Sequence, residues 1–139
     1  MYKFSLSIII SLTFLHTAIA QDAHIGTWHA TDDGKLGYVK FAEDGFAWFI
    51  VDDNPIGGPA FMLDSVECNL TYTINYDVNP YQVDFVVKDN DSQSVVEYLK
   101  GIFVFQINQT QMWLCLDYSG KGRPAKFIDK DTVILDKLD

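Results

Sequence analysis

Apolar and polar residues alternate with a period of two along much of this chain, which is typical of β-strands with one buried and one solvated face. The clearest runs are residues 68–75 and 81–87. Helical periodicity is weak, and only residues 92–98 show any. The pattern predicts strands at residues 25–30, 36–41, 46–51, 68–75, 81–87, 95–107, 111–117, 125–128 and 132–138.

Clusters of Gly, Pro, Asn, Asp and Ser separate these runs, and such clusters are typical of turns. They fall at residues 32–34, 52–55, 57–59, 79–80, 89–91 and 119–122. Strands at roughly regular spacing, joined by short turns, predict an antiparallel sandwich or barrel. We therefore expect one all-β domain.

The first twenty residues have a different pattern. Lys3 precedes an apolar run at residues 4–15, and Ala18-Ile19-Ala20 supplies the small residues that a signal peptidase requires. The run is too short to cross ~30 Å of hydrocarbon, so a signal peptide is favoured over a permanent membrane anchor. We predict a signal peptide at 1–20 and a domain at 21–139, secreted or periplasmic, with no membrane insertion after cleavage.

The charge balance narrows the classes of partner. The chain carries a formal net charge of −9, and removal of Lys3 with the signal peptide would make it −10. Such a surface repels phosphate backbones, so no nucleic-acid partner is expected. Hydrophobic residues make up 48% of the chain, which is enough to build a core and argues against disorder.

Two cysteines, Cys68 and Cys115, allow two interpretations. In an exported protein they could form a disulfide, and they could equally be two separate buried thiols that pack as small hydrophobic groups. The pattern alone leaves this choice open. Their wide separation lacks the CxxC spacing of metal or redox sites.

Several short motifs occur in a recognisable order: Gly26-Thr27-Trp28, residues 79–84 (NPYQVD), 101–103 (GIF), 112–115 (MWLC) and 122–127 (GRPAKF). Together they resemble a bacterial family of small secreted lipocalin-like (calycin-type) domains of uncharacterised function. The departures are Met112, where the family prefers leucine, and the hairpin turn at 108–110. The resemblance implies an antiparallel up-and-down barrel, or a half-open sandwich, of about eight strands. It also implies a structural role in which Trp28 packs across one barrel end and Arg123 stacks on it.

Catalytic chemistry finds little support. The predicted domain has only two histidines, His24 and His29, and no G-x-S-x-G sequence, so we predict no catalytic residue and no enzyme activity. The acidic turn at 89–92 lacks the glycine and terminal glutamate of a calcium loop, so neither a metal nor a cofactor is expected. Sequons begin at Asn69, Asn90 and Asn108, and would matter only in a eukaryotic secretory pathway.

The aromatic residues, 14% of the chain, carry the functional hypothesis. Residues 46–50 and 101–105 are apolar on both faces, so these side chains either fill the barrel or line a pocket in it. The first hypothesis is a non-enzymatic module that binds a small apolar molecule through Trp48, Ile50, Tyr72 and Phe85. The alternative is a protein-interaction or inhibitor-type envelope domain with a filled barrel and an exposed apolar patch around Trp113.

Overall fold

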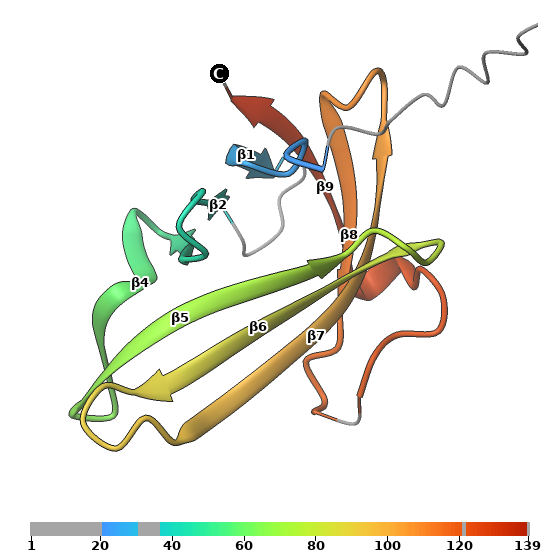
Figure 1. Cartoon of the computed structure of the whole chain (residues 1–139). Coiled ribbons are helices and arrows are strands. Elements are labelled where there is room, and N and C mark those ends of the chain that lie inside the picture. Colours follow the sequence, from blue (N-terminus) through green and yellow to red (C-terminus); the bar gives the residue numbers. More distant parts are fainter. Residues whose placement is uncertain (1–20, 31–36, 121, 139) are drawn as a thin grey trace, which may run out of the picture.

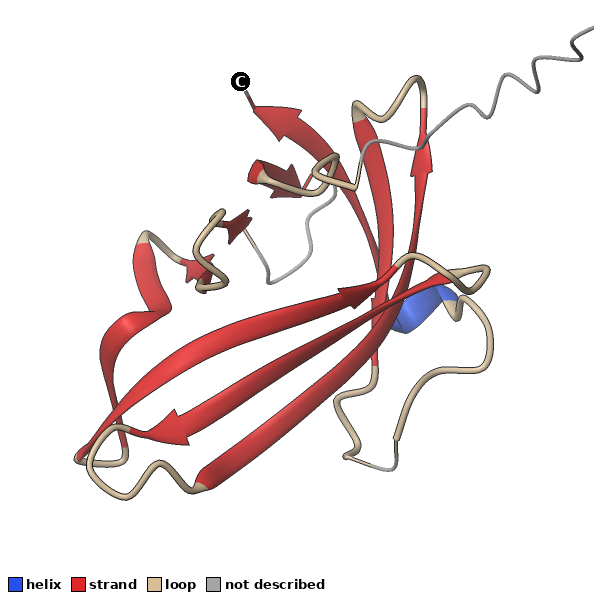
Figure 2. Cartoon of the chain, in the orientation of Figure 1, coloured by secondary structure: helices blue, strands red, loops and turns tan. Residues whose placement is uncertain are grey.

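The alternating runs fold into one closed β-barrel in the computed structural model, which describes residues 21–30, 37–120 and 122–138 (Figures 1 and 2). The predicted signal peptide and the turn at 32–34 lie outside the described residues. The elements are β1 (Gly26–Ala30), β2 (Tyr38–Phe41), β3 (Ala47–Val51), β4 (Asn54–Leu63), β5 (Val66–Asn75), β6 (Tyr81–Asp89), β7 (Val95–Gln106), β8 (Gln111–Leu116), the short 3-10 helix η1 (Asp129–Asp131) and β9 (Thr132–Leu138).

Each strand pairs with its neighbours in the chain, and β9 closes the barrel against β1. The all-β prediction and the barrel are thus confirmed. The barrel is closed rather than half-open, and the described residues form nine strands rather than about eight.

Strand β4 makes this closure possible. All nine pairings are antiparallel, yet a ring of straight antiparallel strands must have an even number, because direction alternates around it. Residues 54–57 pair with β3 and residues 58–63 pair with β5, so β4 reverses between Gly57 and Gly58. Both glycines have positive φ, 134° and 73°, which a side chain would strain. Figure 1 shows the resulting sharp bend in β4.

Two local predictions were wrong. Strand β4 was missed, because Pro55 and residues 57–59 are typical of turns. In the structure these residues lie within β4, at and beside its bend. Residues 125–128 lie in the long β8–β9 connection instead of forming a strand. The weak helical periodicity at residues 92–98 does not produce a helix, since residues 92–94 precede β7 and residues 95–98 are part of it, as the strand predicted at 95–107 requires.

The register defines two barrel ends. At one end, which we call the plugged end, lie residues 21–25, the β5–β6 loop and the β7–β8 turn. There the inward-facing side chains are tightly buried, Trp28, Phe41 and Phe103 among them. Toward the opposite end they are only half-buried, as at Phe49 and Leu99.

The two cysteines lie on opposite faces of the barrel wall. Cys68 shares a strand face with the core residue Leu70, so it points inward. Cys115 lies between the core residues Leu114 and Leu116, so it points outward, under the β8–β9 connection, with its Sγ 3.9 Å from the Lys126 carbonyl oxygen. Both are free and buried, so of the two interpretations the structure has the separate thiols, and a Cys68–Cys115 disulfide is not formed.

The reversal in β4 requires a residue without a side chain at position 58. A Cβ atom there would lie 2.5 Å from the Trp48 indole, whereas at Gly120, with nearly the same φ (71° against 73°), a Cβ would meet nothing within 4 Å. We expect Gly58→Ala to lower the free energy of unfolding by about 2 kcal/mol more than Gly120→Ala, because only the first adds a steric clash to the shared backbone strain. Urea denaturation measures both variants, and equal losses would contradict the proposed packing.

Candidate functional site

The four residues predicted to line a pocket fall on two faces of the wall. Tyr72 and Phe85 are cross-strand partners and point into the barrel. Trp48 and Ile50 point outward, because Ala47 and Phe49 are the residues of β3 that pack in the core. The Lys40 ammonium lies 5.0 Å from the Trp48 ring centre on the outer face. The prediction that these four residues share a pocket is therefore wrong.

The interior around the remaining pair is occupied by protein. Phe85 is 1% exposed and packs against Phe41 and Phe49, with ring centres 5.8 and 4.8 Å away. The Tyr72 hydroxyl donates a hydrogen bond to the Ala42 carbonyl at 2.7 Å. Burial raises the pKa of Tyr72 to about 12, so this hydroxyl stays protonated. Both residues thus serve the core.

The predicted stack of Arg123 on Trp28 is also wrong. Trp28 is fully buried near the plugged end, and the cation over its ring is Lys137, whose Nζ lies 5.4 Å from the ring centre. Lys137 comes from β9, directly opposite Trp28 in the register. Neighbouring strands therefore supply both members of the pair, which the order of motifs along the chain could not reveal.

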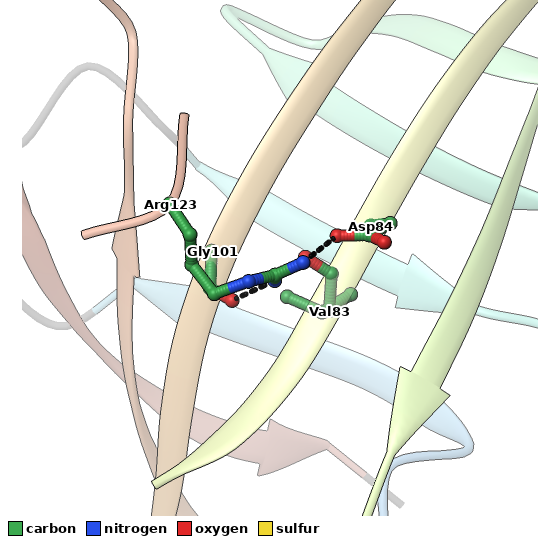
Figure 3. Close-up of polar contacts among 4 residues, drawn as sticks. All are labelled: Val83, Asp84, Gly101 and Arg123. Atoms are coloured by element: carbon green, nitrogen blue, oxygen red, sulfur yellow. Dashed lines mark hydrogen bonds and ion pairs between the residues drawn. The ribbon is translucent and has the colours of Figure 1, made fainter. Parts of the chain in front are cut away.

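Arg123 instead fastens the β8–β9 connection to the barrel wall (Figure 3). Its guanidinium donates hydrogen bonds to the carbonyl oxygens of Val83 and Gly101, at 3.2 and 2.9 Å, and to the Asp84 carboxylate at 2.6 Å. It thereby ties this connection to β6 and β7. Arg123 thus keeps a structural role, at a different place from the one expected.

Residues 21–25 form a turn that closes the plugged end. Ala23 and His24 are each 7% exposed. The Lys137 ammonium donates to the Ala23 carbonyl at 3.2 Å, and the Trp28 indole N–H donates to the His24 carbonyl at 2.8 Å. The start of the predicted domain is therefore part of the fold, although the pattern of predicted strands begins only at residue 25.

The His24 ring lies within a directed chain of hydrogen bonds. Because Tyr72 donates its proton to Ala42, its oxygen accepts from His24 Nε2–H at 3.1 Å. Nδ1 is then the acceptor, and the Tyr76 hydroxyl donates to it at 2.7 Å. The arrangement fits a neutral imidazole. Burial lowers the His24 pKa, Asp22 opposes this shift and Lys137 adds to it.

A groove of about 790 Å³ lies beside this plug, open to solvent at the same barrel end. Its walls are the β5–β6 loop with the start of β6 (residues 76–79 and 81) and the end of β7 with its turn (residues 104–109). Tyr76, Tyr81 and Phe105 supply aromatic surface, with Tyr76 and Tyr81 in edge contact at 4.9 Å between ring centres.

The groove escaped the sequence analysis because turns form most of it. The signal that could have found it is the pair of large apolar residues in these turns, Val78 and Ile107, which are 37% and 66% exposed. Apolar side chains exposed to this extent contribute little to the core, so burial does not explain why each turn carries one.

Within the described part of the chain, no three His, Cys, Asp or Glu side chains gather closely enough to hold a metal ion. No helix among the described residues is long and apolar enough to span a bilayer. Comparison with known protein families, curated proteins and solved structures finds no match for this chain.

The plug should make folding stability depend on pH. The lowered pKa of His24 means that the unfolded chain binds this proton more readily than the folded protein does. The free energy of unfolding should therefore fall as pH drops through the ordinary histidine pKa near 6.5, with a slope of up to about 1.4 kcal/mol per pH unit. Urea denaturation between pH 7.5 and 5.5, values chosen around that pKa, measures the decline.

Two variants identify the group responsible. His24→Gln should flatten this decline, while His29→Gln, which leaves the plug intact, should keep it. An unchanged slope in His24→Gln would show that the plug does not titrate as the geometry requires.

Proposed function

We propose that this protein is a secreted or periplasmic, non-enzymatic lipocalin-like module, and that its groove at the plugged end binds a small molecule. The observation that carries the proposal is the groove itself. Its volume of about 790 Å³ falls within the usual range of ligand sites, and aromatic and apolar side chains converge in it with a few polar groups.

The location differs from the one predicted from sequence. An apolar ligand inside the barrel would have to displace packed rings such as Phe41 and Phe85, which are 1% exposed. Emptying that much core would cost several kcal/mol. The groove requires no such rearrangement, and its exposed Ile107 and Val78 would lose contact with water on binding.

The charges around the groove limit the ligand. Asp77 is the one ionisable carboxylate among the lining residues, and they include no Lys, Arg or His. The whole chain is also acidic, with a net charge of −9. A carboxylate or phosphate ligand would find repulsion and no ion-pair partner, so a neutral ligand with an apolar surface fits best.

A protein partner is the second candidate, and one outer row of side chains favours it. Val104, Trp113 and Ile134 are register neighbours on β7, β8 and β9. Trp113 is 37% exposed and lies on the outer face. Aromatic residues of this kind are enriched where proteins bind one another.

Fragment binding observed by amide NMR tests the proposed function. A mixture of small neutral aromatic and aliphatic fragments should shift the backbone amide signals of residues 76–79, 81 and 104–109 and leave those around Phe85 unmoved. Ile107→Asp should weaken this binding at least tenfold, because it places a charge in the apolar wall. Ile107 has φ 52°, which aspartate tolerates better than isoleucine, so the fold should not suffer.

The matched control is Met62→Asp. Met62 is 64% exposed, against 66% for Ile107, but lies near the opposite end. Binding should survive this change. Shifts confined to Trp113 and Ile134, or none in the groove, would refute the groove and leave the protein-interaction candidate.

A further inference from the structure

We propose that the ligand of the groove is a saccharide, a neutral ring compound rich in hydroxyl groups. The inference rests on the proposed function and adds a chemical class to it. It rests on three features of the groove walls taken together. They present aromatic ring faces, they carry side-chain amides without hydrogen bonds, and they contain no cationic side chain.

The first component is aromatic surface at several angles. The Tyr76 and Tyr81 rings meet at 73°, and Tyr81 meets Phe105 at 55° with 6.0 Å between ring centres. All three side chains are only partly buried. A pyranose ring has one face made largely of C–H groups, which packs on such rings, while its edge carries hydroxyls. The Tyr81 hydroxyl adds a polar group at the end of its ring, whereas the Tyr76 hydroxyl already donates to His24.

The second component is a set of four side-chain amides around those rings: Asn79, Gln106, Asn108 and Gln109. No described residue hydrogen-bonds to any of these amide groups. Amides on other turns behave differently, since the Asn54 amide donates to the Asp52 carbonyl and the Asn90 amide to the Pro59 carbonyl. The groove amides are therefore free to bind a ligand.

These amides argue against a purely apolar ligand. Each offers two donors and one acceptor, and covering them with hydrocarbon would leave those groups unsatisfied at about 1–3 kcal/mol each. Hydroxyl groups both donate and accept, so a saccharide can satisfy amides in either orientation. The absence of Lys, Arg and His from the lining fits a neutral sugar rather than a sugar phosphate or a uronic acid.

Titration calorimetry and amide NMR with three disaccharides test the inference: cellobiose, maltose and N,N′-diacetylchitobiose. We expect at least one to bind saturably and to shift the backbone amide signals of residues 76–79, 81 and 104–109. Asn108→Gly should then weaken its binding about tenfold through loss of the amide's hydrogen bonds. Asn108 has φ 52°, which glycine adopts freely, so the turn should be preserved.

The control is Asn54→Ala, which removes an exposed amide from the β3–β4 turn, at the other end of the barrel, and should leave affinity unchanged. If the disaccharides leave the backbone amide signals of the groove residues unmoved while the neutral fragments shift them, the saccharide class is wrong and the groove remains a binding site. If neither shifts them, both proposals fail. Equal weakening by Asn108→Gly and Asn54→Ala would also overturn the assigned contact.

Discussion

The constraint on which this barrel depends is that nine strands close into a ring in which every pairing is antiparallel. Open edges would expose unpaired N–H and C=O groups to other chains, and closure removes them. An odd number of straight strands cannot satisfy that closure. Closure is possible because β4 changes direction between Gly57 and Gly58. Its first half pairs antiparallel with β3 and its second half pairs antiparallel with β5.

The shape of the barrel follows from this reversal. On the side of the plugged end, the bridge between Phe46 and Thr71 joins the chain just before β3 directly to β5. Farther from that end, β3 and β5 diverge, and the two halves of β4 lie between them. The long strands β5, β6 and β7 therefore extend well past the short β1, β2 and β3, as Figure 1 shows. The short strands can complete a packed core only near the plugged end, which leaves side chains such as Leu99 half-buried.

Much of the fold could be predicted from alternation alone, because a strand with one wet face shows its period in the sequence. Residues 68–75 and 81–87 are such strands, and their inward side chains Tyr72 and Phe85 were assigned to the interior correctly. Alternation fails where both faces are apolar. For Trp48 and Ile50 only the pairing with β2 and β4 decides the face, and Gly58 makes room for Trp48 on the outside.

Contacts between residues far apart in the chain could not be predicted from the sequence either. Nothing in the order of residues indicates that Lys137, rather than Arg123, lies over Trp28, because that depends on β9 closing against β1. The groove was hidden for a related reason: two turns far apart in the chain become its walls only when β6 and β7 pair.

Tyr76 connects the two features of the plugged end. Its hydroxyl donates to His24 in the plug, while its side chain forms part of the groove wall. The β5–β6 loop that carries Tyr76 has no strand partner of its own. The hydrogen bond to His24 therefore holds one aromatic wall of the groove against the turn at 21–25. The groove thus depends on docking of that turn, and a neutral His24 supports both the fold and the shape of the proposed binding site.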